Sequence, residues 1–144
     1  MSMIKCDSQF CACLYYSANA LARVITKMAE EEFAISGFSP SYGFLIMSVN
    51  AKPGIQPKEL SEIMLLTPST ITRLIEKLEN KGMVERKNVG KITEVYPTPK
   101  GLELETIIKE AWSKLYEKYS DILGEDESKI LTANIYKAIK KLEA

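Results

Sequence analysis

Histidine is absent from this chain of 144 residues. It is the most common general base and metal ligand in proteins, and it completes the usual nucleophile pairs with serine and cysteine. Without it, no pair of a nucleophile and a base can be named in the sequence. We therefore expect a protein that is not an enzyme and that needs no cofactor and no metal ion.

Cysteine is scarce, and its three copies, Cys6, Cys11 and Cys13, gather near one end of the chain. An odd, clustered set does not make the disulfide framework of a secreted domain, and free thiols suit a reducing cytosol. Long apolar runs are absent too. The run over residues 44–47 is far too short to cross a bilayer, and residues 1–10 lack the apolar core of a signal peptide. We expect a cytoplasmic protein that does not bind membranes.

Net charge is also absent, because 19 basic residues balance 19 acidic ones. A neutral protein does not coat nucleic acid indiscriminately. The charge is uneven, however: residues 52–101 hold nine basic and six acidic side chains, so this segment carries +3 and the two flanks together carry −3. Such an asymmetry permits a basic face on a neutral protein.

Prolines indicate where helices begin. Four of the six prolines follow a polar residue, and in three cases that residue is Ser or Thr. Proline at the first helical position loses no hydrogen bond, and a preceding hydroxyl can cap a free backbone N–H. In the predicted helix over residues 57–65, the periodicity predicts that Leu60, Ile63 and Met64 face the core. The helices predicted from these prolines cover residues 39–50, 57–65, 68–81 and 99–123.

Two further helices are expected at the ends of the chain. Apolar residues recur at spacings of three and four from Phe10 to Met28, which predicts an amphipathic helix from about Asp7 to residue 33 or 35. A last helix follows Gly124 and also carries an apolar stripe. These stripes exceed what one small domain can cover, so we expect both terminal regions to mediate dimerisation.

The periodicity changes after Gly82, where residues 83–87 and 92–96 have the pattern of short strands. Between them, Asn88 and Gly90 suit the positive φ angles of a hairpin bend. A short helix, a tight turn, a second helix and a hairpin form the order of a winged helix-turn-helix.

The predicted fold class is therefore mainly α, as a winged helix-turn-helix with a two-stranded wing. We expect a single domain over residues 1–144. Its DNA-binding lobe covers residues 39–101, and N- and C-terminal dimerisation helices cover residues 1–38 and 102–144.

In such a motif the second helix enters the major groove, and its N-terminal residues meet base edges. Arg73 suits a bidentate guanine contact, and the short hydroxyls around it allow a close approach to the bases. Basic residues nearby can neutralise phosphates. The candidate DNA-contacting residues are Lys58, Pro68, Ser69, Thr70, Thr72, Arg73, Lys77, Arg86, Lys87 and Lys91.

The run from Leu60 to Arg86, which includes Thr67-Pro68-Ser69-Thr70-Ile71-Thr72-Arg73, resembles the core of the MarR family of transcriptional regulators. Residues 96–101 resemble that family's strand-to-helix junction, and the resemblance covers nearly the whole chain. It implies a homodimeric repressor that binds a palindromic operator in double-stranded DNA and releases it on meeting a small-molecule effector or an oxidant. The family's wing usually carries an Asp-x-Arg or Asp-Arg motif that reaches the minor groove. That motif is absent here, which leaves Arg86 or Lys91 for the contact.

Cys11 has three interpretations. On a helical wheel it falls in the apolar arc, as a small buried side chain would. Residues 9–15 also resemble the segment that holds the reactive cysteine of organic hydroperoxide regulators within the family, which makes Cys11 a candidate redox sensor. Cys13 points to the opposite side of the same predicted helix and cannot pair with it, so a bridge would need Cys6 or the partner chain. A soft-metal site at the three cysteines is a third alternative.

Aromatic residues on the flanking helices are candidates for a ligand cleft, although such residues also pack in cores and dimer interfaces. The alternative function is a protein-interaction module that uses a winged helix without binding DNA, and a small hydrolase is a more distant one. The candidate cleft residues are Tyr15, Tyr16, Trp112 and Tyr116.

Overall fold

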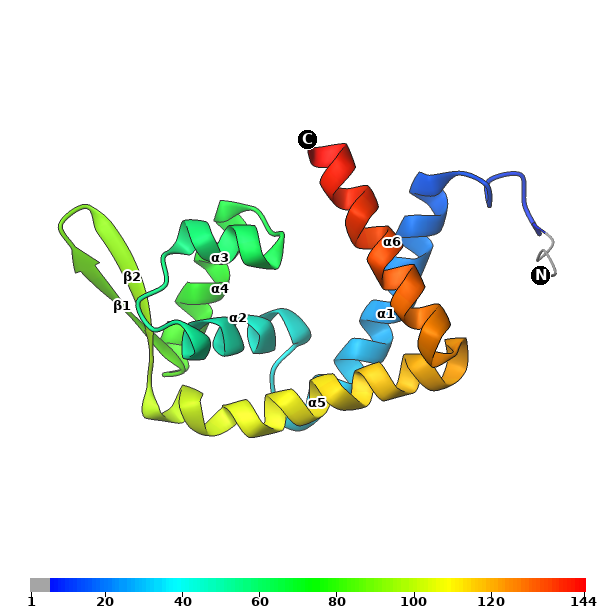
Figure 1. Cartoon of the computed structure of the whole chain (residues 1–144). Coiled ribbons are helices and arrows are strands. Elements are labelled where there is room, and N and C mark those ends of the chain that lie inside the picture. Colours follow the sequence, from blue (N-terminus) through cyan, green and yellow to red (C-terminus); the bar gives the residue numbers. More distant parts are fainter. Residues whose placement is uncertain (1–5) are drawn as a thin grey trace.

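The computed structural model describes residues 6–144, which form six α-helices, one short 3-10 helix and two strands. Figure 1 shows two parts above one long helix, α5: a lobe that ends in the β-hairpin, and an arm that contains both ends of the described chain. No helix in residues 6–144 has the length and apolar character needed to cross a membrane. The elements are α1 (Leu14–Phe33), η1 (Ala34–Ser36), α2 (Pro40–Ala51), α3 (Pro57–Met64), α4 (Pro68–Asn80), β1 (Val84–Val89), β2 (Ile92–Pro97), α5 (Pro99–Leu123) and α6 (Glu125–Glu143).

The predicted fold class is confirmed: the chain is mainly helical, with a two-stranded antiparallel wing. Each predicted proline stands at the first position of its helix. The Thr67 hydroxyl accepts a hydrogen bond from the N–H of Thr70 at 3.4 Å, and Thr98 accepts one from Gly101 at 3.1 Å. Ser39 makes no such cap. These helix starts are therefore set locally, by proline geometry and in two cases by a threonine cap.

The core of the lobe joins α2, α3, α4, the wing and α5. Phe33, at the end of α1, is fully buried and meets the Phe44 ring edge-on at a centroid distance of 5.7 Å. Gly43 allows this approach, because a Cβ there would lie 2.8 Å from the Phe33 ring. The fully buried residues of the core include Leu45, Ile46, Val49, Leu60, Ile71, Leu78, Val95 and Ile108.

The first turn of α5 is locked to the lobe from two sides. The Thr98 hydroxyl donates to the carbonyl of Gly82, and the Asn50 amide of α2 donates to the carbonyl of Gly101 at 3.2 Å. Gly101 is required for this packing, because a Cβ there would overlap the carbonyl oxygen of Met83. The lock places the end of α4, the start of the wing and the start of α5 in one packed unit.

The wing pairs β1 with β2 from Val84 opposite Pro97 to Val89 opposite Ile92. Gly90 has a φ of 65° within the two-residue turn, as expected. Asn88 was also expected at a positive φ, and this was wrong: it lies in β1, and its side chain accepts a hydrogen bond from the Thr93 hydroxyl at 3.1 Å.

The first helix starts later than predicted. It begins at Leu14 rather than near Asp7, and residues 7–12 form turns and bends. A disulfide between Cys6 and Cys11 closes this segment into a loop, with 5.7 Å between the two Cα atoms. Cys13 has the extended backbone of an N-cap residue. The helical wheel that placed Cys11 on an apolar face therefore did not apply.

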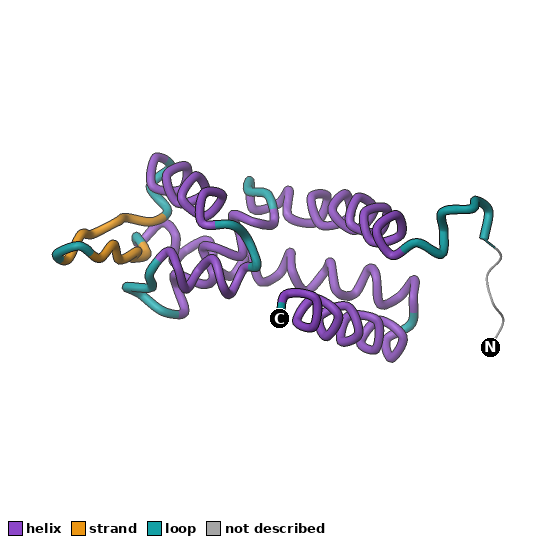
Figure 2. The backbone as a smooth tube through the Cα atoms, turned by 90° about the horizontal axis from the view of Figure 1, so that it is seen from above, coloured by secondary structure: helices purple, strands orange, loops and turns teal. Residues whose placement is uncertain are grey.

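The arm consists of α1, α6 and the far half of α5. Figure 2 shows α1 and α6 on opposite sides of α5. The Nζ of Lys118 on α5 lies 3.3 Å from Oε2 of Glu31 on α1. A groove of about 190 Å³ runs among the three helices. The groove is lined by Leu21, Ile25, Tyr119, Leu123, Ser128, Leu131, Thr132 and Ile135.

Candidate nucleic-acid interface

The helix α4 divides cleanly into a buried face and an exposed one. Ile71 and Ile75 are almost completely buried against α2 and α3, whereas Ser69, Thr72 and Arg73 are exposed. This division is what a recognition helix needs, because its inner face fixes its position while its N-terminal residues stay free to meet bases.

The hydroxyls at the start of α4 are ordered by contacts among themselves. Thr67 and Thr70 place their side-chain oxygens 2.9 Å apart, and the Thr72 hydroxyl donates to the carbonyl of Pro68 at 3.0 Å. The Arg73 Nη2 lies 3.4 Å from the Thr70 hydroxyl oxygen. No carboxylate of residues 6–144 forms a salt bridge with Arg73, so its guanidinium is available to an outside acceptor.

Arg86 is placed differently from the expectation of a phosphate contact. Its Nε and Nη2 donate to Oε1 of Glu79 at 3.0 and 2.8 Å, and its Nη1 lies 3.9 Å from Glu76. The hydrogen bonds from Arg86 hold the pKa of the Glu79 carboxyl below its usual value. Arg86 therefore holds the wing against α4, a pairing across a turn that no pattern in the sequence indicates.

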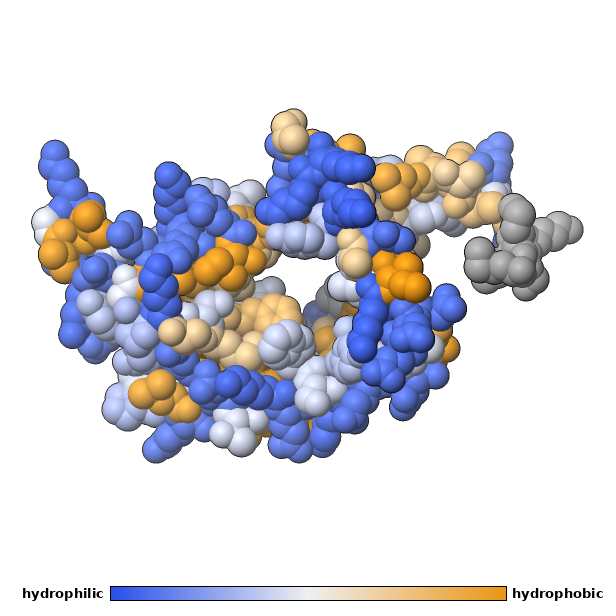
Figure 3. Space-filling view, viewed as in Figure 1, coloured by the Kyte–Doolittle hydropathy of each residue, from blue (hydrophilic) through white to orange (hydrophobic). Residues whose placement is uncertain are grey.

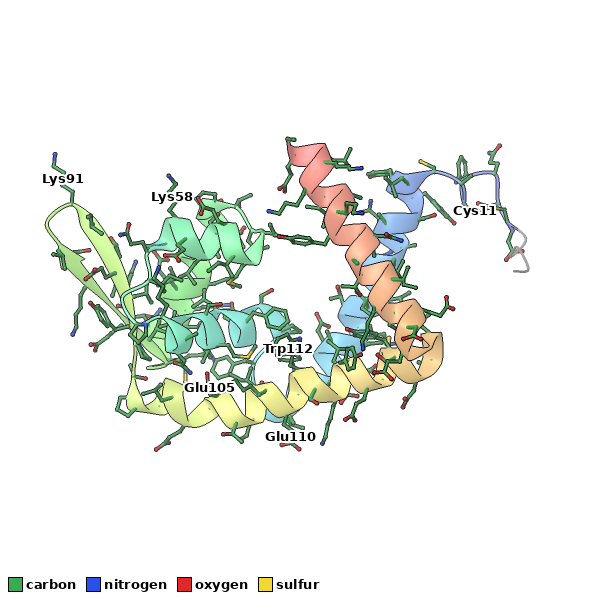
Figure 4. All side chains as sticks on the ribbon, in the orientation of Figure 1. Cys11, Lys58, Lys91, Glu105, Glu110 and Trp112 are labelled. Atoms are coloured by element: carbon green, nitrogen blue, oxygen red, sulfur yellow. A yellow bond between two sulfur atoms is a disulfide. The ribbon has the colours of Figure 1, made fainter. Side chains whose placement is uncertain are left out.

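The remaining basic candidates lie around α4. Lys58 on α3 and Lys91 at the tip of the wing both point toward the same side of the lobe, away from α5 (Figure 4). Lys87 lies with its Nζ 4.8 Å from the centroid of the Tyr96 ring and 3.5 Å from a carboxylate oxygen of Glu85.

Lys77 is brought into a hollow of about 460 Å³ beside α4. Tyr42 and Asn80 also line this hollow, and sequence reasoning missed both of them. The sequence predicts the helix that carries Tyr42, but the contact between that helix and α4 depends on how the two pack. The complete lining is Tyr42, Thr70, Arg73, Leu74, Glu76, Lys77 and Asn80.

The four aromatic candidates do not form one cleft. Tyr15 is 79% exposed in the first turn of α1, and Tyr16 packs near Phe10 with ring centroids 6.0 Å apart. Trp112 lies in the middle of α5, where it meets the Phe44 ring edge-on at 6.0 Å (Figure 4). Tyr116 packs on Tyr119, and none of the four lines the groove of the arm.

The cysteines also differ from expectation. Cys6 and Cys11 are joined to each other rather than free, while Cys13 is free and exposed. A soft-metal site at the three cysteines is therefore excluded in this state, because two of the sulfurs are already bonded. Within residues 6–144, no group of three cysteine, aspartate or glutamate side chains could hold a metal ion.

Comparison of the sequence with known proteins gives matches of different extent. The model of the MarR family matches residues 38–88. The uncharacterized HTH-type transcriptional regulator YybA of Bacillus subtilis is 21% identical over 126 residues, which cover 85% of this chain and 84% of YybA. A riboflavin kinase of Thermococcus kodakarensis is 39% identical over 46 residues, but these cover only 32% of this chain and 22% of the kinase.

Solved structures match over nearly the whole chain. The transcriptional repressor CouR bound to a 23-mer DNA duplex has a TM-score of 0.83 and 15% identity, over 96% of this chain and 99% of CouR. CouR bound to p-coumaroyl-CoA matches equally well. A MarR protein from Peptoclostridium difficile has a TM-score of 0.77 and 23% identity, over 99% of this chain and 93% of that one. The fold of these proteins is therefore the fold of this chain.

Proposed function

Because the chain belongs to the MarR family, whose model matches its winged-helix segment at residues 38–88, we propose that it is a DNA-binding transcriptional regulator that acts as a homodimer. The observation that carries the proposal is the exposed N-terminal half of α4. It presents hydroxyls and the guanidinium of Arg73, which has no salt bridge among residues 6–144, above a buried face. Base reading in the major groove requires this arrangement.

In the proposed complex, Arg73 reads a base and Pro68, Ser69, Thr70 and Thr72 allow the helix to approach closely. Lys58, Lys77, Lys87 and Lys91 neutralise phosphates around it. Lys91 is also the residue for a minor-groove contact, because it stands at the tip of the wing and Arg86 is engaged by Glu79. Arg86 supports the interface by holding the wing rather than by touching phosphate.

Apolar side chains left exposed on the arm support the proposed homodimer. Leu14, Val24 and Ile130 are each at least 60% exposed, and Figure 3 shows hydrophobic residues gathered over α1. Exposed clusters of this kind mark interaction surfaces. In a dimer with two-fold symmetry, each copy covers the exposed apolar residues of the other copy's arm. Such a dimer presents two recognition helices about 34–36 Å apart, which fits a palindromic operator.

The regulator acts as a repressor that an effector releases from DNA. CouR, a repressor of the same fold, is known in complexes with DNA and with a small molecule. For this chain, the effector is a small ligand or an oxidant that acts on the cysteine pair. The predicted cytoplasmic location belongs to the same proposal, since a regulator of transcription works where the DNA is.

Salt-dependent mobility shifts test this function against the alternative of a protein-interaction module. Genomic fragments are incubated with the protein at 50 and 200 mM salt. A DNA-binding protein that contacts six to ten phosphates loses roughly a thousandfold or more in affinity over this range. A protein that retards no fragment at the lower salt is not a DNA-binding regulator.

A further inference from the structure

Charge is divided between the two flanks of α4. At about 100° per residue, Arg73 and Lys77 form a short basic row along the flank of α4 that faces α2, where both line the same hollow as Tyr42. Glu79 lies on the opposite flank, where Arg86 of the wing binds it, and Glu76 lies between the two flanks because it lines the hollow and is also 3.9 Å from Arg86. Since α2 contains no acidic residue, nothing on that helix neutralises the basic row.

The hollow on the α2 flank holds several hydrogen-bond donors. Tyr42 packs its ring near Phe38, with centroids 6.3 Å apart, and its hydroxyl has no hydrogen-bond partner among residues 6–144. Lys77 and Asn80 line the same hollow, and Lys77 forms no salt bridge with a carboxylate of residues 6–144. Glu76 stands at its edge, 3.9 Å from Arg86. A hydroxyl, an ammonium and an amide side by side match the oxygens of a phosphodiester, and they carry no base-specific pattern.

The position of Lys77 also suits a phosphate. It lies four residues after Arg73, so it is about 6 Å further along the helix axis. The major groove is about 8.5 Å deep. When Arg73 reaches a base edge at the floor of the groove, Lys77 stands near its rim, where the phosphates lie.

From this arrangement we propose that the phosphate backbone of one DNA strand runs along the α2 flank of α4, with Tyr42 and Lys77 as its contacts. This inference rests on the proposed function and extends the DNA interface to α2. It assigns Tyr42 as a positioning residue that fixes how α4 sits in the groove. The opposite flank, where Glu79 binds Arg86, faces the wing rather than a phosphate.

The test compares three variants by fluorescence anisotropy. The probes are a duplex that the wild type selects from a random pool and a scrambled duplex of the same composition, each titrated at several salt concentrations. Tyr42→Phe keeps the ring and its packing and removes only the hydroxyl. Lys77→Ala removes the ammonium inside the hollow. Lys81→Ala is the matched control, because it removes the same charge one turn later, where Lys81 lies over the Phe38 ring.

We expect Lys77→Ala to weaken binding to both duplexes and to reduce the slope of log affinity against log salt by about 0.9, the value for one phosphate. Tyr42→Phe should weaken both about threefold to tenfold with an unchanged slope, since it removes a neutral donor. Lys81→Ala should change the slope less than Lys77→Ala does.

Three results overturn the inference. The first is a Tyr42→Phe variant that binds both duplexes like the wild type, and the second is a Lys77→Ala variant that keeps the full salt slope. In both cases salt-dependent binding by the wild type shows that the proposed function itself stands. The third is a wild type that selects no duplex, which removes the proposed function together with the inference. Thermal melting of each variant confirms that it is folded.

Discussion

Glu79 on α4 accepts three hydrogen bonds from Arg86 on β1, one from its backbone N–H at 3.0 Å and two from its guanidinium at 3.0 and 2.8 Å. The pair therefore joins the recognition helix to the wing through both backbone and side chain. The same bonds lower the pKa of Glu79 and raise that of Arg86. The ionised form of Glu79 therefore favours this contact between the wing and α4.

Glu79→Gln should lower the free energy of unfolding at neutral pH by about 0.5–1 kcal/mol, the size expected for a partly exposed ion pair. The folded protein holds the pKa of Glu79 below its unfolded value, so the stabilisation is present above about pH 4.3 and is lost as the pH falls through the lowered folded value. Urea denaturation of both proteins at neutral and acidic pH measures this. Glu85→Gln is the control, because its contact with Lys87 is longer and more exposed. A difference between wild type and Glu79→Gln that grows on acidification contradicts the prediction.

Arg73→Ala should cost about 1–3 kcal/mol of binding free energy and relax sequence preference at one position of each half-site. Within residues 6–144 its guanidinium has a long hydrogen bond to the Thr70 hydroxyl and no salt bridge, so no ion pair among these residues is lost. Lys87→Ala and Lys91→Ala should weaken specific and random DNA alike. Selection from a random pool, followed by sequencing, measures the preference. Equal losses for Arg73→Ala on selected and scrambled duplexes would reduce Arg73 to a phosphate contact.

Val24→Glu should weaken the homodimer at least tenfold. Val24 is 61% exposed on α1, and a carboxylate buried without a partner in an apolar interface costs more than about 1.4 kcal/mol. Val89→Glu is the matched control, since Val89 is 58% exposed but belongs to the wing. Sedimentation velocity at micromolar concentration separates monomer from dimer. A stable monomer in the wild type would rule out the dimer altogether.

The cysteine pair predicts a redox response that differs among the three thiols. If an organic hydroperoxide acts here, it oxidises Cys6 and Cys11 to the disulfide and leaves as an alcohol and water, and a dithiol reverses the step. DNA binding should fall on oxidation and return on reduction. Cys11→Ser and Cys6→Ser should both stay bound throughout, whereas Cys13→Ser should respond like the wild type because Cys13 is outside the pair. A response that persists in Cys11→Ser would make a small ligand the better candidate for the effector.

Local signals made most of the fold predictable. Proline at a helix start acts within one turn, so the starts of α2, α3, α4 and α5 could be placed from the sequence. The start of α1 could not, because the loop closed by Cys6 and Cys11 interrupts an apolar periodicity that suggests a longer helix. The prediction that Ile63 faces the core was wrong, because its side chain is 56% exposed. In a helix of eight residues, three apolar positions do not define which of them meets the core.

The candidate interface was predictable only in part. The sequence shows which residues are basic, but the engagement of Arg86 by Glu79 requires two elements to meet across the turn after α4. The contribution of Tyr42 likewise depends on how α2 packs beside α4. The arrangement of the four aromatic candidates also depends on packing, since Tyr15 lies in the first turn of α1 and Trp112 lies in the middle of α5.

The lock at Gly101 limits how an effector can work. With its first turn fixed to α2 and to the start of the wing, α5 cannot pivot at its N-terminal end, and its 25 residues span about 37 Å as a single rod. Because α5 is one continuous helix that is packed into the lobe at its first turn, we expect a small rotation of the arm to rotate the whole lobe with it. For the proposed dimer, we therefore expect release from DNA to change the separation and tilt of the two lobes and to leave the internal geometry of each lobe unchanged.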